Sequence, residues 1–117
     1  MKDSYVLWVD DERPVSNLIY ELFKDTHNII VCKTFTQARV WIDEIEAFQY
    51  GSEIVVCFDH DLGGKKTGYD LAKYIVENNV KLAAYEVHTM NPVGRENIIQ
   101  LLDHYGYRRI NSNGYFS

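Results

Sequence analysis

The sequence has few of the residues that mark a membrane, secreted or fibrous protein. Its 117 residues include two cysteines and two prolines, and no apolar run is long enough to span a membrane. Cys32 and Cys57 both lie in apolar segments, where a free thiol behaves as a small hydrophobic side chain. The first residues, Met1 to Ser4, do not resemble a signal peptide. We therefore expect a cytoplasmic protein that does not bind membranes.

Basic residues are also scarce. Twelve lysines and arginines face 17 aspartates and glutamates, which gives a net charge of −5. Because non-specific DNA affinity comes mainly from phosphate neutralisation, this charge argues against a duplex DNA partner. A small phosphorylated ligand or an RNA terminus needs only a few local cations and is compatible with it. The composition does not indicate an oligomeric state.

Apolar runs and helical stripes alternate along the chain. The runs are typical of buried parallel strands, and they cover residues 5–9, 29–33, 54–58, 82–88 and 107–111. Apolar residues at helical spacing between these runs predict helices that begin near Pro14, Thr34 or Thr36, Thr67 and Asn91. In the second helix, the predicted buried face consists of Ala38, Trp41, Ile42, Ile45 and Phe48. This alternation predicts one three-layer α/β domain over residues 1–117, with a doubly wound parallel sheet in the flavodoxin-like order 2-1-3-4-5. It leaves four helices and no residues for a fifth, C-terminal one.

Polar side chains follow the predicted strands where each strand ends. They are Asp10 and Asp11 after the first strand, Asp59, His60 and Asp61 after the third, and His88 and Thr89 after the fourth. In a parallel sheet these ends meet at one edge, where carboxylates repel one another unless a proton or cation intervenes. We therefore predict a divalent metal site at Asp10, Asp11 and Asp59, with Mg²⁺ as the expected ion. Alternatively, Asp11 is only a favourable charge near a helix start, and Asp59 and Asp61 only form a turn.

The segment from Asn91 to Arg95 adds positive charge at the same edge. Asn91 suits a helix N-cap and Pro92 the first helical position, so the N–H groups of this helix can receive an anion. Gly94 would let a phosphate approach the first turn, and Arg95 could form a forked contact with it. The predicted phosphate-binding residues are Thr89, Asn91, Gly94 and Arg95. The alternative is an ordinary helix cap followed by a solvated arginine.

Two histidines arrive at this edge from neighbouring strand ends. Histidine titrates near neutral pH, so His60 and His88 could divide the work of a general acid and a general base. We predict that they form the catalytic group together with Asp59. The alternative is that each histidine only makes structural hydrogen bonds. His27 and His104 fall at the opposite edge, and we interpret them as surface or capping residues.

The acidic residues resemble those of a known fold family. Asp10, Asp11 and Asp59 are similar to the acidic pocket of response-regulator receiver domains, and Thr89 lies where receivers carry a serine or threonine. The lysine that receivers carry after the fifth strand is missing, because no lysine follows Lys81.

Longer strings resemble a receiver-derived family, the cyclic-phosphate-processing receiver domains. They are LWVDDERP at 7–14, DHDLG at 59–63, TGYD at 67–70 and HTMNPVGREN at 88–97. The resemblance covers nearly the whole chain and implies metal-assisted phosphoesterase activity on a cyclic nucleotide or a 2′,3′-cyclic end, in RNA repair or phage–host conflict. The residues that distinguish this family from receivers would be His60 and His88. Two other functions remain open: a stand-alone receiver phosphorylated on Asp59, and a protein that binds a cyclic nucleotide without catalysis.

Overall fold

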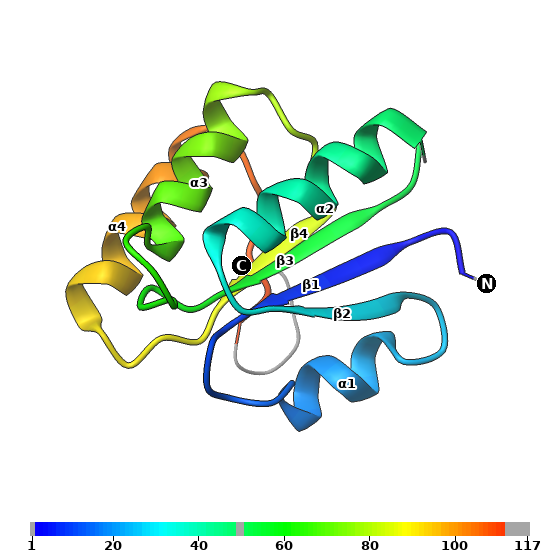
Figure 1. Cartoon of the computed structure of the whole chain (residues 1–117), viewed down its shortest axis with the longest axis horizontal. Coiled ribbons are helices and arrows are strands. Elements are labelled where there is room, and N and C mark those ends of the chain that lie inside the picture. Colours follow the sequence, from blue (N-terminus) through cyan, green and yellow to red (C-terminus); the bar gives the residue numbers. More distant parts are fainter. Residues whose placement is uncertain (1, 49–50, 112–117) are drawn as a thin grey trace.

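The computed structural model describes residues 2–48 and 51–111. Within them, four strands alternate with four helices (Figure 1). The strands are β1 (Tyr5–Val9), β2 (Asn28–Cys32), β3 (Ile54–Phe58) and β4 (Ala84–Val87). The helices are α1 (Asn17–Phe23), α2 (Phe35–Phe48), α3 (Gly68–Glu77) and α4 (Pro92–His104). The predicted α/β alternation is confirmed, and no helix follows α4 before the described residues end at Asn111.

The sheet is parallel and its strand order is β2-β1-β3-β4. The predicted order is confirmed for these strands, but the predicted fifth strand at 107–111 is wrong. In that segment Arg109 forms one isolated parallel bridge with Tyr85 of β4. Tyr85 donates its N–H to the carbonyl of Arg108, and Ile110 donates to the carbonyl of Tyr85. Both hydrogen bonds involve the same residue of β4, Tyr85. The segment at 107–111 therefore lies beside β4 without forming a ladder of paired residues.

Helices cover both faces of the sheet, as the continuous apolar strands predict. Leu7 and Val9 of β1 contribute to a core cluster with α2, α3 and α4, whereas Val6 and Trp8 contribute to a second cluster with α1 (Figure 1). The three-layer architecture is therefore confirmed. Cys32 and Cys57 are buried free thiols, and burial raises the pKa of Cys32 to about 12, so both behave as apolar side chains.

The register of the sheet aligns the strand ends. Val9 pairs with Cys32 on one side and with Phe58 on the other, and Phe58 pairs with Val87. The backbone hydrogen bonds continue one residue further. The N–H groups of Asp10, Asp59 and His88 donate to the carbonyls of Cys32, Val9 and Phe58 at 3.0, 2.9 and 2.9 Å. The sheet itself therefore holds the first polar residue after β1, β3 and β4 at one edge.

Three details differ from the sequence analysis. Helix α1 begins after Ser16, whose Oγ accepts from the N–H of Ile19, and not near Pro14. Trp41 and Phe48 were expected on the buried face of α2 but are 40% and 75% exposed, because the buried stripe follows Ala38, Ile42 and Ile45. His27 and His104 were expected to be surface or capping residues. His27 is buried, with its ring nitrogens beside Thr26 and Glu53, whereas His104 is exposed.

Helix α3 begins with the predicted cap. The Thr67 side chain accepts from the N–H of Asp70, and the Asp70 carboxylate accepts from the N–H of Thr67 at 2.8 Å. This backbone hydrogen bond holds the pKa of Asp70 below its ordinary value. The pKa of Asp70 is therefore lower in the folded chain than in the unfolded chain. The Asp70 hydrogen bond stabilises the fold fully above the unfolded pKa of about 4, and this stabilisation is lost as the pH falls through the folded pKa.

We expect Thr67→Ala to lower the free energy of unfolding by about 1 kcal/mol, measured by urea denaturation at neutral pH. The exposed Thr36 makes no capping bond, so Thr36→Ala is the matched control and should change stability by less than about 0.5 kcal/mol. The cost of Asp70→Asn should shrink as the pH falls below the ordinary aspartate pKa of about 4 and through the lower folded value. An Asp70→Asn cost that stays constant with pH would contradict this assignment.

Candidate metal and phosphate site

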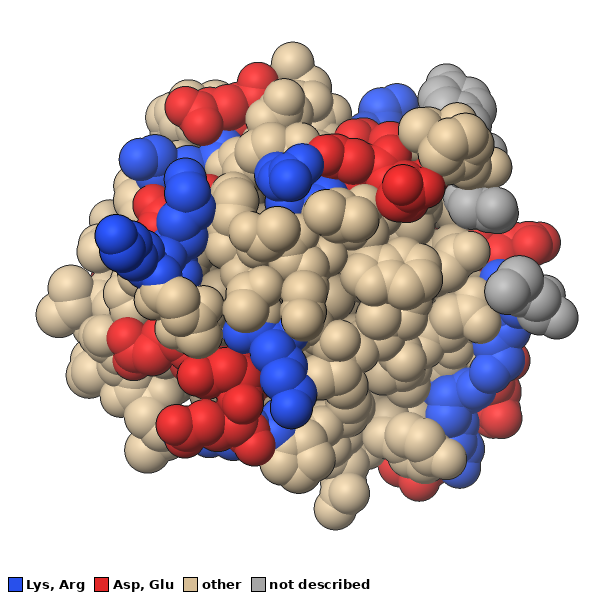
Figure 2. All heavy atoms as spheres, in the orientation of Figure 1, with Lys and Arg blue, Asp and Glu red and all other residues tan. Residues whose placement is uncertain are grey.

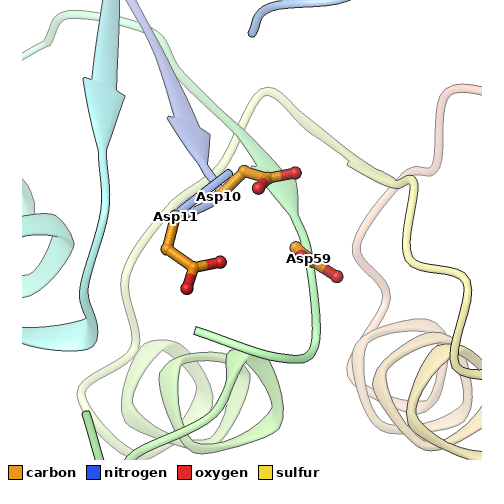
Figure 3. Close-up of side chains that lie close together, drawn as sticks. All are labelled: Asp10, Asp11 and Asp59. Atoms are coloured by element: carbon orange, nitrogen blue, oxygen red, sulfur yellow. The ribbon is translucent and has the colours of Figure 1, made fainter. Parts of the chain in front are cut away.

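Three carboxylates converge at the edge formed by the strand ends. Asp10, Asp11 and Asp59 each offer an oxygen atom within 4.8 Å of the other two (Figure 3). Asp10 is 1% exposed, and Asp11 and Asp59 are half-buried. The structure thus brings together the three residues predicted to hold a metal, although Asp10 and Asp11 come from β1 and Asp59 from β3. Hard oxygen donors at this spacing fit a divalent cation such as Mg²⁺.

Asp10 is held as an anion by its neighbours. Its Oδ1 accepts from the N–H groups of Glu12 and Arg13, both at 2.8 Å, and its Oδ2 lies 3.0 Å from His88 Nε2. Burial raises the pKa of Asp10, but the hydrogen bonds from Arg13, Glu12 and His88 outweigh it and bring the pKa below its ordinary value. A buried carboxylate kept ionised in this way is suited to bind a cation.

Asp59 is positioned by its backbone, and its carboxylate accepts no hydrogen bond from another described residue. The chain turns sharply after it, because the N–H of Gly68 donates to the carbonyl of His60 at 2.8 Å. A Cβ added at Gly68 would lie 2.0 Å from the Asp59 carbonyl oxygen. The first residue of α3 therefore touches the end of β3, and only glycine fits there.

The loop between Asp59 and α3 lies across the end of β2. Gly63 forms an isolated parallel bridge with Thr34, and Lys66 places its Nζ 4.8 Å from the Phe35 ring centroid. Asp61 is exposed and does not belong to the group of three carboxylates. The loop thus brings the ammonium group of Lys66 close to the end of β2, while Asp61 is exposed to solvent.

His88 is restrained on three sides. Its Nε2 lies 3.0 Å from Asp10 Oδ2, its Nδ1 lies 2.8 Å from Glu86 Oε1, and its ring stacks on Trp8 with a centroid distance of 3.9 Å and an interplanar angle of 4°. One carboxylate oxygen thus lies within hydrogen-bond distance of each ring nitrogen, and an ionised carboxylate only accepts hydrogen bonds.

His60 has a different environment. Its Nδ1 is buried and has no hydrogen-bond partner among the described residues. The ring lies against Gly94 in the first turn of α4, where an added Cβ would be 2.3 Å from His60 Cγ. A phosphate was expected in the space beside Gly94, and in the structure the His60 imidazole occupies it. A phosphate contact at Gly94 stays a prediction, and it would require the imidazole to move.

The start of α4 is built as expected. Asn91 is the N-cap, its side chain accepts from the N–H of Gly94 at 2.9 Å, and Pro92 is the first helical residue. Thr89 is buried, and its Oγ1 accepts from the N–H of Asn91. Arg95 was expected to be free for a phosphate, but its guanidinium donates to the carbonyl of Val87. That bond uses one of its donors and anchors the side chain beside the end of β4.

Two residues at the site were missed by the sequence analysis: Trp8 and Glu86. Both lie inside strands that were read only as apolar runs. A signal was present, because Glu86 is a charged residue in an apolar strand and stands two positions before His88. Residues two apart in a strand share a face, so their contact follows from the period of the strand.

The candidate site is defined by its chemistry and not by a large cavity. Two surface hollows of about 580 and 550 Å³ lie near the opposite edge of the sheet, one beside Ile54 and Lys81 and the other beside Tyr5 and Asn28. Neither is lined by a predicted site residue. On the face shown in Figure 2, lysine and arginine side chains are interrupted by aspartate and glutamate, and they form no continuous basic surface.

A parallel sheet in the order β2-β1-β3-β4, with carboxylates after β1 and β3, has the arrangement of receiver domains. The crystal structure of the Mn²⁺-bound form of response regulator Rcp1 has the same fold, with a TM-score of 0.60 and 22% sequence identity over 84% of this chain and 75% of that chain. The model of the cyclic-phosphate processing receiver domain family matches residues 5–104, and the chain belongs to this family. No curated protein matches the sequence. Among the described residues, none of the helices has both the length and the apolarity to cross a membrane.

Proposed function

We propose that this protein is a metal-assisted phosphoesterase that opens a cyclic phosphate, either a 2′,3′-cyclic RNA end or a cyclic nucleotide. The observation that carries the proposal is the convergence of three carboxylates from β1 and β3 beside His88, in a chain of the cyclic-phosphate processing family. An RNA-repair or phage–host setting is the context that the family resemblance suggests.

Asp10, Asp11 and Asp59 would hold the divalent ion, with Mg²⁺ as the expected species. Such an ion polarises a phosphoryl oxygen and offsets the charge that develops in the transition state. The three carboxylates fit it because their oxygens already lie within 4.8 Å of one another. The Mn²⁺ in the similar Rcp1 structure supports a divalent ion in this fold.

The two histidines would divide the proton transfers. Water oxygen forms a bond to phosphorus as one of its protons leaves, and the bond from phosphorus to a ribose oxygen breaks as that oxygen gains a proton. His60 suits the base, because its Nδ1 has no hydrogen-bond partner among the described residues. His88 would then be the acid: its Nε2 lies 3.0 Å from Asp10 Oδ2, so proton transfer to the ribose oxygen would require that contact to break. The N-terminus of α4, Thr89 and the remaining donors of Arg95 would bind the non-bridging oxygens.

Hydrolysis of 2′,3′-cyclic nucleotides with and without Mg²⁺ tests the proposal. We expect Mg²⁺-dependent formation of the monoester, and a loss of at least about a hundredfold in the His60→Ala/His88→Ala double variant. His104→Ala is the matched control, because this exposed histidine lies at the far end of α4. Unchanged activity in the double variant would exclude the proposed histidine roles. A ligand that binds and is recovered intact would instead indicate sequestration.

A second candidate function is a phospho-accepting receiver. It is favoured by the place of Asp59 at the end of β3 in a receiver-type sheet, with a carboxylate that accepts no hydrogen bond from the other described residues. The absence of a lysine after Lys81 weighs against it. Incubation with a small phosphodonor and Mg²⁺, followed by intact mass measurement, separates the two functions. A stable adduct that is absent from Asp59→Asn would identify the receiver.

A further inference from the structure

Glu86 carries a carboxylate on the interior of the sheet that the proposed reaction does not use. The register places Trp8, Cys57 and Glu86 in one row across β1, β3 and β4, on the face that α1 covers. The Glu86 side chain is only 13% exposed. A carboxylate at such a position costs free energy unless it has a partner, and its partner is Nδ1 of His88 at 2.8 Å.

The same imidazole also contacts a carboxylate of the candidate metal site. On the other side of the imidazole, His88 Nε2 lies 3.0 Å from Asp10 Oδ2. The exposed fractions of the Glu86, His88 and Asp10 side chains are 13%, 11% and 0%, so these three ionisable groups are largely shielded from water. A ring with an acceptor at each nitrogen cannot flip or rotate without losing both contacts.

Trp8 and Arg13 make further contacts that hold the His88 ring in place. Trp8 stacks on the His88 ring, and its Nε1 donates to the carbonyl of Arg13 at 2.9 Å. Arg13 in turn donates its N–H to Asp10 Oδ1 at 2.8 Å and its guanidinium to the His88 carbonyl at 3.0 Å. These hydrogen bonds link Trp8, Arg13, Asp10 and His88. Among the described residues, Glu86 reaches Asp10 only through its hydrogen bond with His88.

We propose that Glu86 is a positioning residue for the cation site. It orients the His88 ring so that Nε2 lies at Asp10 Oδ2, which leaves the one remaining lone pair of that oxygen for the cation held with Asp11 and Asp59. The inference rests on the metal site of the proposed function. The proposed role of Glu86 is to orient the His88 ring and not to supply charge. An amide oxygen at residue 86 can accept the hydrogen bond in place of the carboxylate, whereas an aliphatic side chain cannot.

Mn²⁺ binding tests this inference without any activity assay. Free Mn²⁺ is measured by electron paramagnetic resonance during titration of the full chain. We expect Glu86→Leu to weaken Mn²⁺ binding by about 10- to 100-fold, the usual range for a residue that supports a metal ligand, and Glu86→Gln to stay within about threefold of the unaltered chain. Glu12→Gln controls for the loss of one nearby negative charge, because the Glu12 side chain is exposed.

The fluorescence of Trp8 gives a second readout, in a Trp41→Phe background that leaves Trp8 as the single tryptophan. We expect the emission to change in Glu86→Leu, where the stacked ring is released, and to stay as it was in Glu86→Gln. Equal Mn²⁺ affinity in Glu86→Leu and the unaltered chain would overturn the inference. A Gln variant as weak as the Leu variant would also overturn it, since charge and not orientation would then matter. If the unaltered chain binds no Mn²⁺, the metal site of the proposed function fails and this inference fails with it.

Discussion

Asp59→Asn is expected to stabilise the metal-free protein and to abolish both its response to Mg²⁺ and its hydrolytic activity. Three carboxylate oxygens within 4.8 Å repel one another, and each pair costs between about 1 and 3 kcal/mol over the range from water to a protein surface. The Asp59 carboxylate is half-buried and accepts no hydrogen bond from the described residues, so its loss removes repulsion without breaking a contact. We therefore expect the metal-free protein to gain about 1 kcal/mol.

The same change removes one of the three proposed metal ligands. Thermal unfolding in the presence of a chelator and in excess Mg²⁺ should show a stabilisation by Mg²⁺ in the unaltered chain and none in Asp59→Asn. Hydrolysis should fall at least about a hundredfold, which corresponds to about 3 kcal/mol of transition-state stabilisation. Asp61→Asn is the matched control, because Asp61 is exposed and lies outside the group of three. Retention of the Mg²⁺ effect in Asp59→Asn would rule out this metal site.

Gly68→Ala is expected to have the largest effect on folding. The added Cβ would lie 2.0 Å from the carbonyl oxygen and 3.0 Å from the carbonyl carbon of Asp59. These are backbone atoms of a residue whose N–H is bonded to β1, so no side-chain rotation relieves the overlap. Either α3 moves away from β3 or Asp59 moves away from Asp10. We expect a loss of about 3 kcal/mol in the free energy of unfolding, measured by urea denaturation.

The same loop provides the control. A Cβ added at Gly63 would lie 3.6 Å from the Lys33 carbonyl oxygen, which is an ordinary contact. We expect Gly63→Ala to change stability by less than about 1 kcal/mol and to keep the Mg²⁺ effect. Similar stabilities for the two alanine variants would show that the approach of α3 to β3 is not a constraint on the fold.

The histidines show how far the sequence carries the interpretation of the site. Residue order places His60 and His88 directly after or near the ends of two strands, and the parallel sheet then brings both to one edge. Their side-chain partners depend on other elements. His60 lies against Gly94 of α4, and His88 lies between Asp10 and Glu86. These contacts join residues up to 78 positions apart, and no local pattern reports them.

The errors have a similar origin. The apolar segment at 107–111 has the composition of a strand, but whether it forms a ladder depends on how it meets β4, and it makes a single bridge there. Trp41 and Phe48 fit a helical stripe by type, but the stripe that faces the sheet passes through Ala38, Ile42 and Ile45. Burial at such positions is decided by the orientation of the helix on the sheet.

The sequence by itself determined the parallel α/β architecture, the helix caps at Thr67 and Asn91, and the arrival of Asp10, Asp11 and Asp59 at one edge. Strand period, capping chemistry and the common direction of parallel strands are local or topological properties, so they can be read from residue order. Only the tertiary structure decided which groups touch: the buried line from Glu86 through His88 to Asp10, and the imidazole of His60 beside Gly94. Those contacts depend on register and side-chain direction across separate elements, which are fixed only when the whole core packs.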